Sequence, residues 1–438
     1  MNSEQDNRTF ERPDSDPEAK PAALPRAAVA LILVLPFIVQ ASYLDSGFYY
    51  DDDFHLEQCA RVGRGEISLW QYVTLPHGEH LIPVWKTMFF ACWSAFGENS
   101  FAFHLFVTAF HATSALCLLA LLRHYGSAHA AVFGSVLWAG AAIGGWDGPF
   151  LWLAASHLSV GVTFFLIAML CVTQYHTSYH RRWALLMSLA LAVSLLTMGS
   201  LIVLTPVLPL QFFLFEWRSR IELRKAVPWL WSWLLPCLVV GGLHLWWVAP
   251  AMQQLDRPAI NLWAGLQMLG GGYAASSWNL LFFAGNAVTW GRVAGTGLLA
   301  ILILRTDRRA QKLSLLFFSL SFCFSALAYL ARSGWEVDHV LTWGRYRYLP
   351  TLFWCVTAGG VLDWLQRESG RGKAALVGFG TALAAVIFLV AQCRIASEAA
   401  NVFRQIAAEP QHATAPEQKT QASTIDIDRN TPFRIQCG

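Results

Sequence analysis

Long uninterrupted apolar segments recur along the chain, and short polar breaks separate them. A helix needs about 20 mostly apolar residues to cross a bilayer, and most of these segments meet or approach that length. They are continuous rather than alternating, unlike the short amphipathic strands of a membrane β-barrel. The pattern predicts an all-α polytopic membrane protein with about eleven spanning helices, over residues 26–44, 101–122, 129–145, 152–174, 183–198, 201–215, 228–248, 289–304, 313–330, 348–364 and 374–393.

The charged breaks predict which side of the membrane each loop faces. The stretches "HTSYHRRW", "EWRSRIELRKAV", "RTDRRAQK" and "QRESGRGK" are rich in arginine and lysine. If 183–198 and 201–215 form a hairpin, all four stretches lie on one side, whereas one long kinked helix would split them. Because basic loops are retained in the cytoplasm, we expect the hairpin, with the opposite face outside the cytoplasm.

This orientation divides the chain into three parts. Residues 1–25 are polar and Pro-rich, which predicts a disordered cytoplasmic N-terminus. Residues 26–393 form the transmembrane domain, and 394–438 form a short extracytoplasmic tail. A cleaved signal peptide is the alternative for 26–44, but the flank before it is rich in Asp and Glu rather than basic.

The outer face holds a long first loop, about 45–100, and the segment 249–288. Within the first loop, "HLIPVWKTMFFACWSAFG" is apolar but short and carries Lys86. We therefore expect an interfacial helix that lies along the outer leaflet. The glycines of "LGGGYAASSWN" in 249–288 would suit a mobile lid, although a plain interfacial loop fits the same residues.

Composition supports the membrane assignment. The chain of 438 residues is 55% hydrophobic and 13% charged, whereas a soluble domain carries about 25% charged residues. The net charge of +3 says little about partners, and no Walker loop, GxGxxG or GxSxG motif is present. No nucleic-acid partner is expected. Cys59 and Cys437 lie in polar regions and could pair, which the sequence does not decide.

Three consecutive acids follow the first apolar segment in "SGFYYDDDFHLEQ". Adjacent like charges should raise the pKa of at least one of Asp51, Asp52 and Asp53 unless a cation is near. A charged, solvated loop is the simplest explanation. The surrounding aromatic residues favour a partly buried acid at the level of the lipid headgroups instead.

Asp147, Arg345 and Arg347 are further charged candidates on the outer face. Asp147, in "IGGWDGP", is either a turn aspartate or a second site acid, and it is the only charged residue between Arg123 and Arg181. Arg345 and Arg347, in "WGRYRYLP", oppose the positive-inside trend. They are either snorkelling anchors or a phosphate site, because arginine binds phosphate bidentately.

Histidines and one lysine form the last group of candidates. His77, His80 and Lys86 fall in "LPHGEHLIPVWK". The HxxH spacing is not a zinc signature, because it lacks the i, i+4 helical spacing and a third ligand. His104 and His111 would share one helix face, where we expect hydrogen bonds to neighbouring helices.

Three stretches, in this order, resemble the GT-C superfamily of membrane glycosyltransferases. They are "YYDDDFHL", the run from "HGEHLIPVWK" to "LLALLRH", and "GRYRYLPTLFW". Members of the superfamily, such as protein O-mannosyltransferases and the lipid A aminoarabinose transferase, use polyprenyl- or dolichyl-phosphate-linked sugars. The resemblance implies a GT-C fold and an inverting sugar transfer to a hydroxyl on the periplasmic face of a bacterial inner membrane. The chain lacks the family's Lys-Glu pair at "TMGSLIVLTP", which leaves the donor subtype open.

The resemblance also implies roles for individual residues. The catalytic acid falls within Asp51–Asp53, with Asp52 the first choice and Asp53 the next. Asp147 corresponds to the family's second acid, which orients the acceptor or, with Asp53, holds a divalent ion such as Mg²⁺ or Mn²⁺. The residues implied in binding the donor phosphate, or in supporting it, are Arg345, Lys86, Arg347, His77, His80 and Tyr346.

The partners implied are a polyprenyl-phosphate-linked sugar, membrane lipids and an acceptor. The acceptor could be a protein such as a pilin, a lipid headgroup or a polysaccharide. A lipid-linked saccharide flippase would place charges near the bilayer midplane, often in two repeated halves, and no internal repeat is present. An O-antigen ligase or polymerase would show a larger late outer loop than 331–347, and a noncatalytic scaffold is the remaining alternative.

Overall fold

The computed structural model describes residues 24–48, 50–77, 80–142, 150–216, 220–248, 260–281, 297–298, 301–335, 337, 344–369, 386–401 and 404. In this part of the chain all regular structure is helical, apart from one isolated bridge between His77 and His80. Five helices are long and apolar enough to cross a membrane: Arg26–Tyr43, Ser100–Tyr125, Leu153–Ser178, Val227–Trp247 and Arg308–Ala331. The expectation of a helical, multi-pass membrane protein is confirmed.

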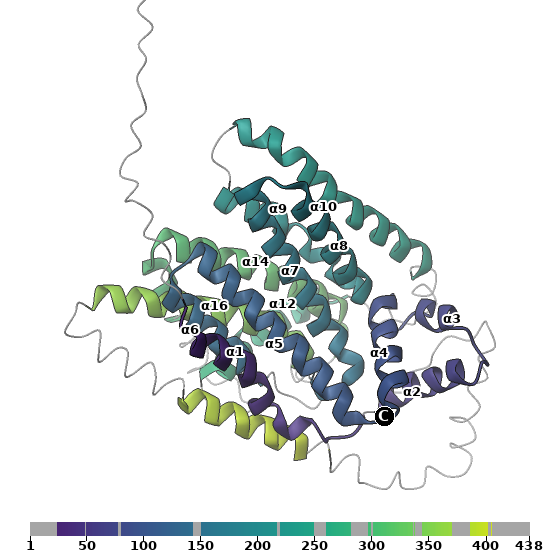
Figure 1. Ribbon diagram of the computed structural model, residues 1–438. Coiled ribbons are helices and arrows are strands. Elements are labelled where there is room, and N and C mark those ends of the chain that lie inside the picture. The colour runs from purple at the N-terminus through teal and green to yellow at the C-terminus, as the bar shows by residue number, and fades with distance from the viewer. Residues whose placement is uncertain are drawn as a thin grey trace, which may run out of the picture.

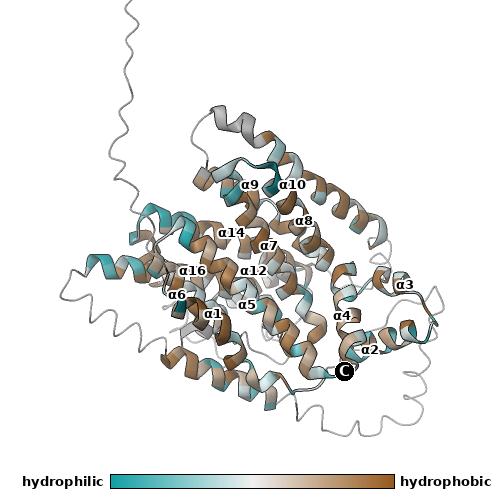
Figure 2. Ribbon diagram, viewed as in Figure 1, coloured by the Kyte–Doolittle hydropathy of each residue, from teal (hydrophilic) through white to brown (hydrophobic). Residues whose placement is uncertain are grey.

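The spanning helices pack side by side in one bundle (Figure 1). Contacts are most extensive between α7 and α8, between α6 and α16, and between α14 and α16, while α5 packs against both α6 and α7. Hydrophobic residues run along these helices and hydrophilic residues gather toward their ends (Figure 2). The bounds are α1 Arg26–Val39, α5 Ser100–Tyr125, α6 Ala128–Ala139, α7 His157–Ser178, α8 Arg181–Thr197, α10 Arg220–Trp247, α14 Arg308–Ala331 and α16 Tyr348–Glu368.

The basic loops meet at one end of the bundle, which we call the basic end. There the Lys312 ammonium donates to the Leu214 carbonyl oxygen, 2.6 Å away. Arg367, in the last turn of α16, forms an ion pair with Asp307, the N-cap residue of α14. The second contact joins two of the four basic stretches directly, and the first places Leu214, two residues before "EWRSRIELRKAV", beside them. The expectation that these three stretches share one side is therefore supported.

Residues 199–216 cross back through the bundle without forming a regular helix. They form η3 (Gly199–Leu204), α9 (Val207–Gln211) and the π-helical turn η4 (Phe212–Glu216). Gly199 lies against His244 near the end of α10, whereas Leu214 lies at the basic end. Proline lacks an amide hydrogen and clashes with the preceding turn, so Pro206 interrupts the helix between η3 and α9, and Pro209 lies in the first turn of α9. The hairpin is confirmed, but its second arm is irregular.

Helix α12, Leu262–Leu281, corrects the prediction for 249–288. It packs antiparallel to α14, because Gly265 contacts Leu330 whereas the Tyr273 and Ser321 hydroxyls lie 2.5 Å apart. A Cβ on Gly272 would meet the Tyr329 oxygen at 2.1 Å, so this glycine allows close helix packing. The lid and outer-loop interpretations are wrong for 262–281. Most of the span predicted at 289–304 falls outside the described residues.

Three short helices lie at the end of the bundle opposite the basic end: α2 (Tyr50–Gly63), α3 (Leu69–Thr74) and α4 (Pro83–Phe96) (Figure 1). Helix α4 is the predicted interfacial helix, with Trp85 and Phe89 buried and Phe96 60% exposed. The aspartates belong to the first turn of α2 rather than to a loop. Carboxylates in a first turn are favoured by the helix dipole.

The chain returns to this end in its last described helix, residues 386–401. The Gln392 side-chain oxygen accepts a hydrogen bond from the Ala142 amide at 2.9 Å. Arg404 lies 3.6 Å from the Asp45 carboxylate. The helix therefore extends past residue 393, where the tail was predicted to begin.

Candidate active site

A four-residue turn, η2 (Leu153–Ser156), is the point where the candidate residues meet. Asp52 of α2 accepts hydrogen bonds from the Leu153 amide at 3.3 Å and the Ala154 amide at 2.7 Å. Its side chain is 0% exposed. Hydrogen bonds to a carboxylate favour its ionised form, so Asp52 is an oriented anion that fixes α2 to η2.

Asp53, the next residue, points to solvent. It is exposed, and burial of part of its surface together with the nearby Glu98 carboxylate raises its pKa. A raised pKa makes a carboxylate a better proton acceptor. The side chain of Asp51 lies outside the described residues. Among the described acids of the triplet, Asp53 is thus the accessible one and Asp52 the anchored one.

Arg345 approaches the same turn from the other side. It belongs to η5 (Gly344–Arg347), which leads directly into α16. Its guanidinium lies 4.6 Å from the centre of the Trp152 ring, a cation–π contact. Since Asp52 holds residues 153 and 154, the predicted acid and the predicted phosphate-binding arginine flank one three-residue stretch. Sequence reasoning placed both on one face but did not show this junction.

The other members of the arginine motif are more enclosed. Tyr346 is 8% exposed and its ring lies 5.7 Å from that of Tyr329. Arg347 is half-buried at the last position before α16. Arg345 and Arg347 therefore lie at the same helix end, as predicted. Tyr346, between them in η5, packs against Tyr329 of α14.

Lys86 faces the protein interior rather than the surface. Its side chain is 0% exposed, and Nζ donates to the backbone carbonyl oxygens of Tyr72 at 3.3 Å and Leu75 at 2.5 Å. Cations stabilise the free carbonyls at a helix C-terminus, so Lys86 holds the end of α3 against α4. Burial lowers the pKa of Lys86 to about 7.

Four histidines cluster beside Lys86. The ring of His55 lies 4.9 Å from that of His77, and the His157 ring lies 6.4 Å from His77 and 5.7 Å from His80. Burial, His77, Lys86 and His157 all lower the pKa of His55. His77 and His80 were predicted, but His55 and His157 were missed. His55 lies two residues after the aspartate triplet, and His157 has no local sequence signal.

His111 bonds to neighbouring helices as predicted, whereas His104 bonds to residues outside helices. The two ring nitrogens of His104 lie within hydrogen-bond distance of the Phe150 and Gly47 carbonyl oxygens, at 2.8 and 3.0 Å. Those of His111 contact the Tyr348 hydroxyl and the Trp138 oxygen, at 3.2 and 3.0 Å. Both residues join segments of the bundle rather than line an open site.

The metal hypothesis rests on Asp147, which lies in the stretch 143–149, outside the described residues. Among the residues that the structure describes, no three His, Cys, Asp or Glu side chains are placed to hold a metal ion. Cys59 is a buried free thiol, and Cys437 lies outside the described residues.

Comparison with solved structures finds similarity at low sequence identity. The archaeal oligosaccharyltransferase AglB from Archaeoglobus fulgidus, in complex with an inhibitory peptide and a dolichol-phosphate, is 13% identical with a TM-score of 0.49, over 94% of this chain and 61% of AglB. ArnT from Cupriavidus metallidurans, bound to undecaprenyl phosphate, is 13% identical with a TM-score of 0.44, over 87% of this chain and 76% of ArnT. This chain thus spans about three fifths of the length of AglB. No family model and no curated protein matches the sequence.

The described geometry combines an exposed carboxylate, an anchored carboxylate and a guanidinium at one end of a membrane bundle. An exposed carboxylate with a raised pKa can take a proton from a hydroxyl. A guanidinium held on an aromatic face can stabilise charge on phosphate oxygens. The arrangement is therefore equipped for displacement of a phosphate by a hydroxyl at a membrane surface.

Proposed function

We propose that this protein is a GT-C type glycosyltransferase that moves a sugar from a polyprenyl-phosphate donor to an acceptor hydroxyl. The observation that carries the proposal is the junction at η2, where Asp52 holds Leu153 and Ala154 while Arg345 lies on Trp152. The junction lies at the start of the long apolar helix Leu153–Ser178, which suits a donor that is carried by a lipid. The eleven-helix count and the bacterial inner membrane, with the site on its periplasmic face, are part of the proposal.

Proton removal falls to the acid pair. The acceptor hydroxyl loses its proton to the exposed Asp53 carboxylate as the hydroxyl oxygen attacks the anomeric carbon. Asp52 keeps α2 and η2 in register through its two amide contacts. The sugar–phosphate C–O bond breaks as the new C–O bond forms on the opposite face, so the sugar inverts.

Charge on the departing phosphate falls to the arginines. The bonding electrons move to the phosphate oxygen, and fixed cations stabilise that charge in the transition state. Arg345 is the main phosphate ligand and Arg347 supports it. Lys86 supports the site indirectly, because it holds the end of α3. His77, His80 and Tyr346 are supporting residues at the border of the site. Asp147 orients the acceptor, or with Asp53 binds a divalent Mg²⁺ or Mn²⁺ ion.

The test is complementation of a strain that lacks this gene, at equal membrane expression of each variant. Mass spectrometry of envelope glycans and glycoproteins should show one missing sugar in the deletion strain, restored by the wild type. D53N and R345Q should reduce transfer about 100-fold or more, the range for loss of a general base. E57Q is the matched control, because Glu57 lies on α2 and is exposed at the surface.

Two results would contradict the proposal. Full activity of the Asp51→Asn, Asp52→Asn and Asp53→Asn variants would exclude the acid triplet as the base. A deletion strain with unchanged glycans, but with lipid-linked saccharide accumulated on the cytoplasmic face, would indicate a flippase instead.

A further inference from the structure

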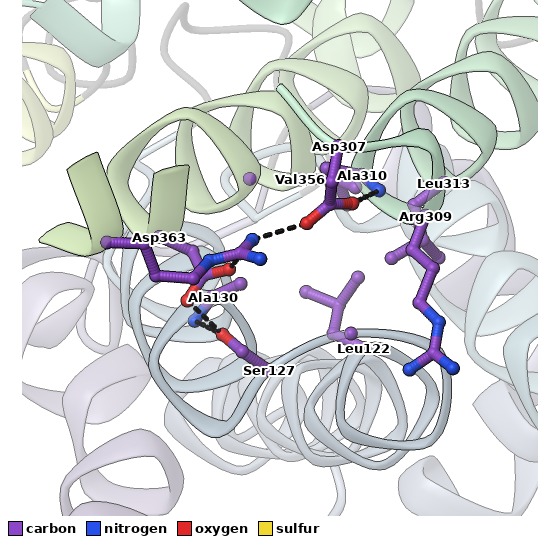
Figure 3. A pocket seen from close by; sticks show the side chains of 12 residues that line it. Leu122, Ser127, Ala130, Asp307, Arg309, Ala310, Leu313, Val356 and Asp363 are labelled. Atoms are coloured by element: carbon purple, nitrogen blue, oxygen red, sulfur yellow. Dashed lines mark hydrogen bonds and ion pairs between the residues drawn. The ribbon is translucent and has the colours of Figure 1, made fainter. Parts of the chain in front are cut away.

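A cavity of about 190 Å³ lies at the basic end, far from η2 along the bundle. It is enclosed by the turn between α5 and α6, the start of α14 and the end of α16 (Figure 3). Small residues leave this space open, since Gly126, Ala130, Ala310 and Gly360 stand where larger side chains would fill it. Its apolar side is formed by Leu122, Leu313 and Val356.

One side of the cavity carries net negative charge. The Arg367 guanidinium pairs with both the Asp307 and Asp363 carboxylates. The Ser127 hydroxyl donates to the other Asp363 oxygen at 2.5 Å. Two carboxylates against one guanidinium leave a charge of about −1, and Asp363 itself is 6% exposed. This side can accept further hydrogen bonds from a cation.

The opposite side carries positive charge. Arg309 lines the cavity from the first turn of α14 and has no ion-pair partner among the described residues. Figure 3 shows Arg309 and Asp363 on opposite sides, with Leu122 between them. A guanidinium without a carboxylate partner is suited to bidentate contact with a phosphate.

We propose that this cavity binds the headgroup of a phospholipid with a primary amine, with its phosphate on Arg309 and its ammonium on the Asp307–Asp363 side. The chemistry is that of ethanolamine phosphate, an anion and a cation a few ångströms apart. A lipid fits better than the free zwitterion because the cavity has an apolar side and is lined in part by α5 and α14, which are long and apolar enough to cross a membrane. Basic pockets between such helices bind lipid headgroups.

The charge pattern distinguishes this lipid from two common alternatives. A purely anionic headgroup such as glycerol phosphate would contact Arg309 but would leave the two carboxylates without a cation. A choline headgroup carries positive charge but no N–H, so it cannot donate to Asp363. The cavity therefore selects for a primary ammonium and not for charge alone.

Native mass spectrometry of the full chain in detergent tests this inference without any transfer assay. Phosphatidylethanolamine, its N-methyl and N,N-dimethyl derivatives, phosphatidylcholine and phosphatidylglycerol are titrated separately, with soluble phosphoethanolamine as a further arm. One molecule of phosphatidylethanolamine should be retained. The affinity should fall with each added methyl group, by up to about tenfold for each charge-assisted hydrogen bond that is lost. Soluble phosphoethanolamine should bind more weakly than the lipid.

Variants on α14 provide the matched control. R309Q should abolish the preference for phosphatidylethanolamine, whereas R308Q, at the neighbouring exposed position outside the cavity, should keep it. Equal binding of phosphatidylcholine and phosphatidylethanolamine would overturn the inference, as would unchanged binding by R309Q. Tighter binding of phosphatidylglycerol would identify a simple anion site and would overturn it as well.

Discussion

Replacing Lys86 with methionine separates its structural role from a role in donor binding. The Lys86 side chain is buried. Both hydrogen bonds described for its Nζ go to backbone carbonyl oxygens, those of Tyr72 and Leu75. Methionine has a similar length and no charge. If Lys86 holds α3 rather than the donor, the K86M variant should keep the donor KM within about twofold at about pH 6, where the wild-type amine is charged and could contact a phosphate.

The magnitude follows from the pKa of Lys86, which burial lowers from 10.5 to about 7. Each pH unit between these values corresponds to about 1.4 kcal/mol. The folded state therefore bears a penalty of about 5 kcal/mol that is fully present below pH 7 and disappears as the pH rises toward 10.5. The two carbonyl contacts reduce this figure, because they favour the ammonium form.

Denaturant unfolding in detergent at pH 7.5 and 9.5 measures the effect. Over these two pH units the wild type should gain up to about 2.7 kcal/mol relative to K86M. K312M is the control, because Lys312 also donates to a carbonyl but is exposed. If the free energies of unfolding of wild type and K86M changed in parallel with pH, the reasoning would be refuted. A large rise in the donor KM of K86M would instead indicate that Lys86 binds the donor.

Three further predictions concern packing and anchoring. D52N should lower the free energy of unfolding by about 2 kcal/mol, because one η2 amide loses a charged acceptor; an unchanged unfolding midpoint would contradict this. W85F should lower it by about 1 kcal/mol, because the Trp85 indole N–H donates to the Ser156 hydroxyl at 2.9 Å; W70F, at an exposed tryptophan, should not. G359L should prevent folding, because a Cβ there would lie 2.6 Å from the Ala130 carbonyl oxygen, and normal yield of monodisperse protein in detergent would exclude this packing.

The membrane-spanning helices were predictable because hydrophobic length is a local property. The segments that became α1, α5, α7, α10 and α14 are each long and apolar, and the four basic stretches indicated their orientation. Helix α12 was missed because its glycines, serines and asparagine lower its hydropathy. Gly265 and Gly272 allow α12 to pack closely on Leu330 and Tyr329 of α14. The sequence of α12 alone does not show this contact.

The site was predictable only in part. The aspartate triplet and the arginine motif stood out because charge is rare in this chain. The burial of Asp52 and Lys86, and the exposure of Asp53, depend on which face of α2 and α4 meets the bundle. His157 joins His77 and His80 through tertiary packing alone, so no spacing along the chain could have indicated it.

The irregular crossing at 199–216 has a consequence for how the protein is assembled. A helix satisfies its own carbonyl groups within the bilayer, but an irregular segment cannot. Here residues from later in the chain add hydrogen bonds to the segment: the Trp233 indole N–H donates to the Thr205 carbonyl oxygen at 2.9 Å, and Lys312 donates to the Leu214 carbonyl oxygen. Helices α10 and α14 therefore fix the position of this crossing, so the second arm of the hairpin depends on elements that follow it in the chain.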